Sequence, residues 1–467
     1  MDRGFYIIMA AQFFSALADN ALLITAIAML REIQAPAEYE PLLKLFFTFS
    51  YVVLAAFVGA FADSMPKGRV MLISNTIKII GCLMMIAGAN PLYAYAVVGL
   101  GAAAYSPAKY GILTEYLPHS KLVVANSWIE GLTVGAIIIG TMAGGWLISP
   151  YVQEAFHTVD AMLFGEVAGS LLDYSMGAIA GLYLIAAVFN LWVPDTGVDH
   201  RVLHRNPWFL VRDFAHCVKL LWTDKLGQIT LAVTTLFWGA GATLQYIMLR
   251  WAEDALNIPL HQATYLQGIF AVGVAVGAVL AGKLIPINKS VKVISVGIAM
   301  GFAALLMIPI HSLLPASILM VAVGAMAGFF VVPMNALLQH RGHILMGAGH
   351  SIAVQNFNEN LGILVMLALY TLMVSADLPV WLVILMFGGF IIVSMYLVRR
   401  WHLFNMREHK HELERLLAIA AAAHQPIHTG HVPTTGESLK GYLPKPRNVV
   451  KNTVRFIRGP GRRDKHR

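Results

Sequence analysis

The chain has 467 residues, of which 58% are hydrophobic and only 12% are charged. Soluble domains usually carry about 25% charged residues, so the composition excludes an ordinary soluble protein and favours one that crosses a bilayer several times. The net charge of +8 does not indicate nucleic-acid binding, because no aromatic platform accompanies the basic residues. Cys82 and Cys217 stand in no CxxC or metal-ligand spacing, so neither a disulfide framework nor a thiolate metal site is expected.

Long apolar runs predict two sets of six membrane-spanning helices. The first set covers 5–30, 42–64, 70–88, 92–114, 122–149 and 174–193, and the second covers 228–250, 262–285, 292–311, 315–339, 349–374 and 378–400. The expected domains are an N-terminal half at 1–193, a linker at 194–227, a C-terminal half at 228–400 and a basic tail at 401–467. No cleavable signal peptide is expected, because the first apolar run is itself long enough to span.

The distribution of Lys and Arg predicts the orientation of these helices. One set of alternate loops contains twelve of them: Lys67, Arg69, Lys121, Arg201, Arg205, Arg212, Lys219, Lys225, Lys283, Lys289, Lys292 and Arg341. The other set contains three: Arg31, Lys44 and Arg250. The richer side should be cytoplasmic, which places both termini on the cytoplasmic side of the inner membrane.

Three segments outside the spans have distinct compositions. The 150–173 segment has four carboxylates and no Lys or Arg, which indicates a periplasmic excursion. The linker sequence "NPWFLVRDFAHCVKLLWTD" predicts an amphipathic helix on the cytoplasmic leaflet that begins at Asn206 and Pro207. A short charged helix should open the tail, and 424–467 is expected to be disordered and lipid-associated.

The two halves also contain a weak internal repeat. "PAKYGILTEYLPHSKLVVANSWIEGL" resembles "PMNALLQHRGHILMGAGHSIAVQNFNENL", and both fall at helix four or ten, a loop, and helix five or eleven. Each copy opens with a proline followed two residues later by a polar side chain, and each ends with an amide four residues before a glutamate. Parallel six-helix repeats are typical of one large transporter fold.

Five ionisable residues remain well inside the predicted spans, and these are the candidate substrate-binding residues: Asp19, Lys78, Lys109, Glu130 and Glu359. A charge at this depth costs several kcal/mol, on the order of 3 or more, unless it faces the bundle interior and finds partners. Such residues could be buried ion pairs that fix helix register, and this alternative is strongest for Lys78. The favoured interpretation is a mixed-sign site, in which the cations bind phosphate and the carboxylates bind an ammonium group.

A second motif, "GAFADSMPKGRV", predicts a gate near the end of helix two. Asp63 can accept hydrogen bonds from helix N-termini and pair with a basic residue, while Lys67 and Arg69 supply positive charge. The motif is typical of major facilitator proteins, although Pro66 stands where glycine is usual. Elsewhere, GxxxG pairs predict close helix approach: Gly140 with Gly144, Gly273 with Gly277, and Gly324 with Gly328.

Several longer blocks resemble the bacterial lysophospholipid transporter family of the major facilitator superfamily. They lie in matching order between about Ala10 and Tyr370: "AQFFSALADNALL", "FADSMPKGRVM", "GAAAYSPAKYGIL", "LFWGAGATL", "GFFVVPMNALLQHRG" and "AVQNFNEN". The resemblance implies an all-α membrane protein with the major facilitator fold and twelve helices in two halves.

The resemblance also implies a function and further site residues. It implies a flippase that brings lysophospholipids, notably lysophosphatidylethanolamine, to the cytoplasmic leaflet, where an acyl-carrier-protein-dependent acyltransferase restores the second chain. Asp19 and Asn20 occupy the "DN" of helix one, Lys109 the "PAKYG" block, and Glu359 the "NEN" block, as headgroup or gate residues. Gln245 follows "GATL", where relatives can carry arginine, so Lys109 is expected to bind more of the phosphate.

Other classes of function fit the sequence less well. The alternative within the superfamily is a proton-coupled exporter of drugs or amphiphiles, in which the buried carboxylates would titrate. An acyltransferase is disfavoured because no His is followed five positions later by Asp. The tail histidines His409, His411, His424, His428 and His431 have no carboxylate or Cys to complete a closed set, so no metal or cofactor is expected.

Overall fold

A computed structural model describes residues 3–117, 119–164, 170–197, 207–346 and 348–422, and every regular element within these ranges is helical. The first half contains α1 (Arg3–Glu32), α2 (Tyr39–Val53), α3 (Ala55–Asp63), α4 (Lys67–Ile86), α5 (Pro91–Tyr116), α6 (His119–Leu147), α7 (Pro150–Phe164) and α8 (Leu171–Leu191). The rest contains α9 (Pro207–Thr223), α10 (Gly227–Leu256), α11 (Leu260–Leu284), the 3-10 helix η1 (Ile287–Val293), α12 (Ile294–Leu305), α13 (Leu313–Met346), α14 (Ala348–Ser375), α15 (Val380–Glu408) and α16 (Lys410–Ala422).

The predicted spans all fall on these helices, with one clear difference. The span predicted at 42–64 is broken at Leu54 into α2 and α3, whereas hydropathy indicated one helix. A helix is present where the linker helix is predicted: it is α9, on which Trp208 is exposed and Leu221 is buried. Its position on the cytoplasmic leaflet stays a prediction. The charged helix predicted at the start of the tail appears as the end of α15 followed by α16, and 424–467 lies outside the described residues.

Nine helices among the described residues are long and apolar enough to cross a membrane. The number rises to ten if the bent pair at Gly131–Leu147 and Pro150–Thr158 forms one span. The all-helical, multi-pass architecture is therefore confirmed. The count of twelve stays a prediction. The pair α2 and α3 is not among the described helices that are long and apolar enough to span, and neither is α5.

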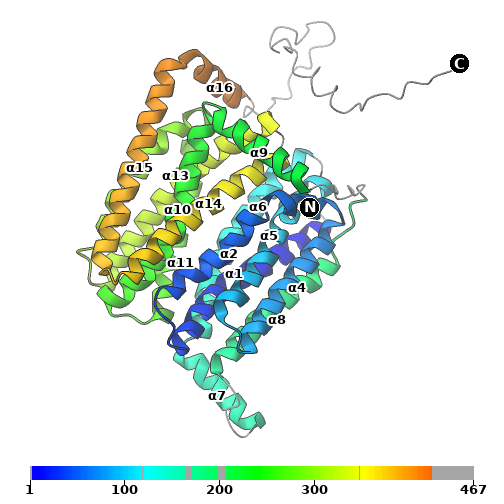
Figure 1. The fold of residues 1–467 in the computed structure, drawn as a ribbon, viewed down its shortest axis with the longest axis vertical. Helices are drawn as coiled ribbons and strands as arrows, with labels where there is room; N and C mark the ends of the chain where they lie inside the picture. The colour runs from blue at the N-terminus through cyan, green and yellow to red at the C-terminus, as the bar shows by residue number, and fades with distance from the viewer. Residues whose placement is uncertain (1–2, 118, 165–169, 198–206, 347, 423–467) are drawn as a thin grey trace, which may run out of the picture. The chain divides into compact units, whose positions relative to one another are not determined.

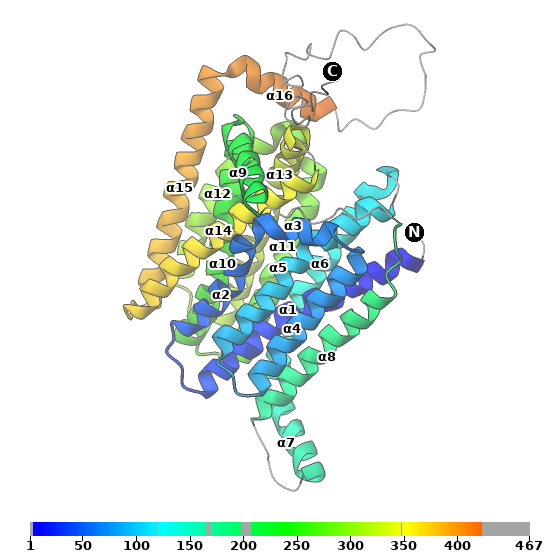
Figure 2. The same cartoon turned by 45° about the vertical axis from the view of Figure 1, so that its right-hand side comes forward.

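The bundle has two ends that differ in what they carry. Figure 1 shows α7 projecting from one end, and α9 and α16 lying at the other; Figure 2 shows the same separation from a second direction. These are called the α7 end and the α9 end below. The helices alternate in direction, so the first residues of α1 and the last residues of α15 both lie at the α9 end.

Hydrophobic packing joins the two halves at the α7 end. One large buried cluster includes Leu22 and Leu30 of α1 together with Ile247 and Trp251 of α10, and it continues through α11 and α14. The smaller clusters of described residues at the α9 end each belong to one half, with the linker helix packed on the second half. The structure is therefore closed by apolar contact at the α7 end.

The predicted GxxxG faces are confirmed as sites of close helix approach. Gly273 and Gly277 of α11 lie against the backbone of α13, where a Cβ at Gly277 would stand 1.9 Å from the Ala325 carbonyl oxygen. Gly324 and Gly328 return the contact from α13, and Gly140 and Gly144 lie against α1 in the same way: a Cβ at Gly140 would come within 2.5 Å of a carbonyl oxygen of α1. Only a residue without Cβ permits these separations.

We expect Gly277→Ala to destabilise the protein by about 1–3 kcal/mol, because the new methyl group meets backbone that cannot rotate away. Gly282 of the same helix is the matched control, since a Cβ there meets nothing within 4 Å. Thermal unfolding of purified protein in detergent should show a lowered Tm for Gly277→Ala and an unchanged or slightly raised Tm for Gly282→Ala. Equal Tm values for the two variants would contradict the packing argument.

Candidate functional site

The most deeply placed polar group is an ion pair between α1 and α4. The Lys78 ammonium lies 2.9 Å from each oxygen of the Asp19 carboxylate and donates to the Ser15 hydroxyl at 3.0 Å. The Lys78 side chain is 1% exposed, whereas Asp19 keeps 26% of its side chain exposed. A buried ammonium requires such partners, because an unpaired charge at this depth is far less stable than in water.

Aromatic and amide side chains complete the surroundings of this pair. The Tyr183 hydroxyl of α8 donates to Asp19 Oδ1 at 2.7 Å, and the rings of Tyr105 and Tyr183 lie 5.0 and 5.3 Å from the Lys78 Nζ. The Ser15 hydroxyl donates in turn to the Asn75 side-chain oxygen at 2.8 Å. Contacts from α4 and α8 therefore hold the Asp19 carboxylate of α1 in one orientation, while part of it stays accessible.

Lys109 belongs to a second polar group, on α5 and α6. Its ammonium donates to the Thr133 hydroxyl at 3.0 Å, and its backbone carbonyl accepts from the buried Gln12 side chain of α1 at 3.1 Å. Pro107 lies inside α5, two residues earlier. A proline removes one helical hydrogen bond, that to the carbonyl four residues earlier, so α5 is locally weakened one turn before the Gln12 contact.

Glu359 belongs to a third group, on α13 and α14. Gln355 donates to the Glu359 carboxylate at 2.7 Å and to the Asn335 side-chain oxygen at 3.3 Å, and Glu359 is 8% exposed. Pro333 lies inside α13, just as Pro107 lies inside α5. The repeat predicted from the sequence thus corresponds to two similar places in the fold, each with a helix-internal proline and a polar side chain that reaches the next helix.

The remaining predicted binding residues lie elsewhere on the helices. The Asn20 side chain donates to the Ala16 carbonyl at 2.8 Å within its own helix. Gln245 of α10 lies beside Gln267 of α11, which donates to the Gln245 backbone carbonyl at 3.1 Å. Glu130 lies on α6, but its side chain is outside the described part of the chain. Only Asp19 and Lys78 of the predicted charges are brought together directly by the described contacts.

A charged cluster links the two halves at the α7 end. Arg31 at the end of α1 pairs with Glu40 of α2, with 2.7 Å between Nε and Oε1, and also with Glu253 of α10, with 3.0 Å between NH2 and Oε2. Arg31 belongs to the first half and Glu253 to the second. This ion pair therefore closes the same end that the apolar cluster closes.

The predicted gate lies at the α9 end, within the first half. Lys67 is 4% exposed; its ammonium donates to the Ala62 carbonyl at 2.8 Å and pairs with the Glu115 carboxylate at 3.2 Å. Arg69 is exposed. Asp63 is the last residue of α3, and its side chain lies outside the described residues. Lys67 thus joins the α3–α4 turn to α5, and the gating role stays a prediction.

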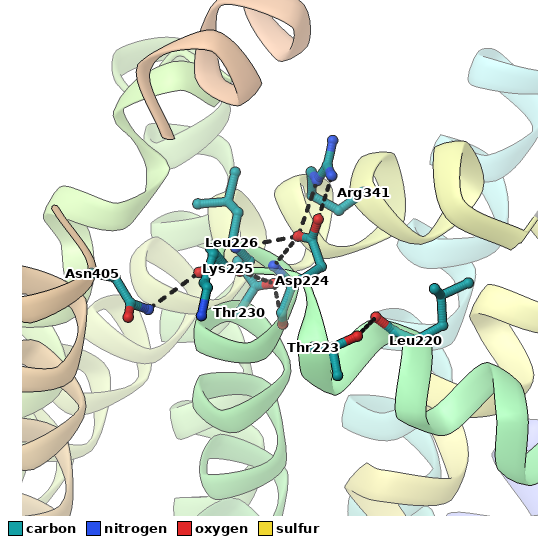
Figure 3. Close-up of polar contacts among 9 residues, drawn as sticks. Leu220, Thr223, Asp224, Lys225, Leu226, Thr230, Arg341 and Asn405 are labelled. Carbon is teal, nitrogen blue, oxygen red and sulfur yellow. Dashed lines mark hydrogen bonds and ion pairs between the residues drawn. The ribbon is translucent and has the colours of Figure 1, made fainter. Parts of the chain in front are cut away.

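A buried ion pair fixes the corresponding end of the second half (Figure 3). Arg341 of α13 donates to both carboxylate oxygens of Asp224, at 3.3 Å from Nε and 2.5 Å from NH2, and the two side chains are 4% and 9% exposed. Asp224 also accepts from the backbone amides of Leu226 and Gly227, at 3.2 and 2.7 Å. It therefore caps α10 as well as joining the linker to α13.

Sequence reasoning missed three of these features. Tyr183 is one of many aromatic residues in apolar helices, and nothing in its local sequence distinguishes it. Arg31 and Arg341 fall in predicted loops, and Asp224 falls at the end of the predicted linker helix; charge is ordinary at all three places. Opposite charges at helix ends on the same side of the membrane could have indicated these ion pairs. Several different pairings of such residues fit the sequence equally well.

The comparisons with known proteins agree with this architecture. Residues 8–366 match the model of the Major Facilitator Superfamily. The lysophospholipid transporter LplT of Yersinia enterocolitica is 39% identical over 381 residues, which cover 81% of this chain and 89% of that protein. LplT of Klebsiella pneumoniae is 39% identical over 401 residues, with 86% and 96% covered. The chain belongs to the LplT family of the Major Facilitator Superfamily.

Structural comparison supports the fold independently. A crystal structure of a point mutant of the nucleoside transporter NupG superposes with a TM-score of 0.64 at 13% identity. The match covers 85% of this chain and 98% of that one. At this low sequence identity the match establishes the fold alone and gives no information about the substrate.

We expect Lys78→Gln to destabilise the protein more than the double variant Asp19→Asn/Lys78→Gln. Removing one partner of a buried pair costs about 3–5 kcal/mol, and less here because Asp19 is partly exposed. Removing both charges leaves neutral groups that can still exchange hydrogen bonds. Thermal unfolding of the single and double variants measures the difference. A double variant less stable than Lys78→Gln would show that the pair is not the source of the penalty.

Proposed function

We propose that this protein is a lysophospholipid transporter that moves lysophospholipids, especially lysophosphatidylethanolamine, from the outer to the inner leaflet of the inner membrane. Membership of the LplT family supports the substrate class. The observation that carries the proposal is the Asp19–Lys78 group, which holds a partly exposed carboxylate in the middle of the helices. A polar headgroup cannot cross hydrocarbon without such groups to replace its hydration.

Both signs of charge needed for a zwitterionic headgroup are present on neighbouring elements. Lys109 is the proposed phosphate partner, because an ammonium is a strong donor to phosphate oxygens. Asp19 and Glu359 are the proposed partners of the ethanolamine ammonium, with Glu130 a further candidate from the sequence. Lys78 is buried against Asp19, so its proposed role is to position that carboxylate. A site sized for one acyl chain would exclude ordinary two-chain lipids.

The proposed orientation places the α9 end in the cytoplasm, with both termini, and the α7 end in the periplasm. The excess of Lys and Arg in the loops at the α9 end supports this. In that orientation the structure is closed on the periplasmic side by the Arg31–Glu253 pair and the shared apolar cluster. Transport then requires these contacts to open and re-form as the halves rock against each other.

Delivery of the lysophospholipid to the cytoplasmic leaflet implies a partner enzyme on that side of the membrane. A lysophospholipid delivered to the cytoplasmic leaflet lacks one acyl chain, so an acyl-carrier-protein-dependent acyltransferase on that side would restore it. Surrounding membrane lipids are the other expected contacts of the chain. The proposal includes no catalytic activity, because the relatives of this chain are named as transporters.

The direct test is uptake of defined lysophospholipids by purified protein in liposomes. Lys109→Ala should lose most transport of every lysophospholipid, about tenfold or more, because all of them carry the phosphate. Asp19→Asn and Glu359→Gln should reduce transport of the ethanolamine substrate several-fold more than that of the glycerol substrate.

The exposed Lys219→Ala on α9 serves as the control and should transport normally. If the Asp19→Asn and Glu359→Gln variants lose transport of both substrates equally, these carboxylates do not bind the ethanolamine ammonium. Transport that stops when a pH gradient is dissipated would favour the proton-coupled exporter instead.

The periplasmic closure can be tested with a cysteine at Thr264, which is fully buried on α11 against Gly145 of α6. In a Cys82→Ser/Cys217→Ser background, an impermeant maleimide added to spheroplasts should label Thr264→Cys slowly. Glu253→Gln should raise the labelling rate several-fold, because the Arg31 pair no longer favours the closed state.

Asp254→Asn is the matched control, since Asp254 pairs within α10 with Arg250. An equal rise in labelling with Asp254→Asn, or labelling only after the cells are opened, would contradict the closure or the orientation.

A further inference from the structure

Three metal-ligating side chains meet where the linker helix lies against the first turn of α14. Asp213 and Cys217 are four residues apart on α9 and therefore share one face of it. His350 comes from the start of α14. One ligand atom from each, a carboxylate oxygen, a thiol sulfur and an imidazole nitrogen, lies within 4.8 Å of the others.

The spacing of these atoms fits a tetrahedral cation. His350 Nε2 and Asp213 Oδ2 are 3.5 Å apart. Two nitrogen or oxygen ligands at about 2.1 Å from a tetrahedral ion stand roughly 3.4 Å from each other, so this edge is already near its bound length. The Asp213 and His350 side chains are 49% and 55% exposed, and they have the freedom to close on the buried Cys217 sulfur.

The two helices that supply the ligands are held in register by separate contacts. Trp222 of α9 donates its indole N–H to the Asn358 side-chain oxygen of α14 at 3.0 Å. The rings of Phe214 and Phe357 pack edge to face with centroids 5.4 Å apart. The site is therefore built between two packed helices, and its ligands need only side-chain rotations to converge.

Other roles explain the arrangement less well. A half-exposed His–Asp pair alone contributes little to stability. A borderline divalent cation displaces the thiol proton and uses all three groups at once, and Cys, His and Asp are each ordinary zinc ligands.

We propose that Asp213, Cys217 and His350 form a binding site for a divalent cation of the zinc class, with three protein ligands and one open position. The bound cation fastens the linker helix to α14. Sequence spacing did not reveal the site, because His350 is distant in the chain and only the fold brings it to α9. This proposal does not depend on the transported substrate.

Cadmium is the probe, because a thiolate–cadmium bond adds a charge-transfer absorption that histidine and carboxylate ligands do not produce. Titration of the full-length purified protein with Cd²⁺ should give this band with saturation at one equivalent. Cys217→Ser should abolish it. His350→Ala and Asp213→Asn should weaken binding about tenfold or more each, by analogy with the loss of other groups that support a metal site. Zn²⁺ should compete for the site and raise the Tm of the wild type but not of Cys217→Ser.

Two matched variants control the experiment. Cys82→Ser removes the other cysteine, which is buried in α4, and His216→Ala removes the exposed histidine beside Cys217; both should retain the band. A correctly sized elution peak and unchanged Tm without metal establish that Cys217→Ser is folded. The proposal is overturned if the band survives in Cys217→Ser, or if His350→Ala and Asp213→Asn bind Cd²⁺ as tightly as the wild type, which would show a thiol acting alone.

Discussion

The cost of placing charge in hydrocarbon is the constraint on which the rest of this structure depends. Lys78 is almost fully buried, and it is tolerated because Asp19, Ser15 and two tyrosine rings surround its ammonium. That requirement draws α1, α4, α5 and α8 together around one point. The same geometry leaves part of the Asp19 carboxylate accessible, so a group needed for stability is also available to a ligand.

The two ends of the bundle are held in different ways, as the proposed rocking of the two halves requires. At the α7 end the halves share a continuous apolar cluster and the Arg31–Glu253 ion pair. At the α9 end, Lys67 with Glu115 ties helices within the first half, and Arg341 with Asp224 ties helices within the second. Contacts inside a half can persist while contacts between halves break, which is the behaviour expected of two rigid bodies that rock.

The linker helix α9 is predicted to lie on a lipid surface, and it also makes specific contacts with the second half. It packs on α14 through Trp222 and Phe214 and continues into the Asp224 cap of α10. Movement of α14 is therefore coupled directly to the connection between the halves. The Asp213, Cys217 and His350 cluster lies at this contact, so a cation bound there would act on the element that both halves share.

The sequence alone determined the class of the protein, the positions of its helices and most of the polar residues inside them. Apolar runs of membrane length and the rarity of charge within them reflect the bilayer, which acts on each segment separately, so local sequence contains the signal. The Pro107 and Pro333 repeats and the GxxxG faces were recognisable for the same reason, since each depends on neighbours within one helix.

Only the tertiary structure decided which of these groups meet. It paired Asp19 with Lys78, broke the second predicted span at Leu54, joined Arg31 to Glu253 and brought His350 close to Cys217. Such contacts depend on the rotation and tilt of each helix, which are set by side-chain packing against several neighbours at once. Periodicity along one helix cannot fix that angle, because it is a property of the whole bundle.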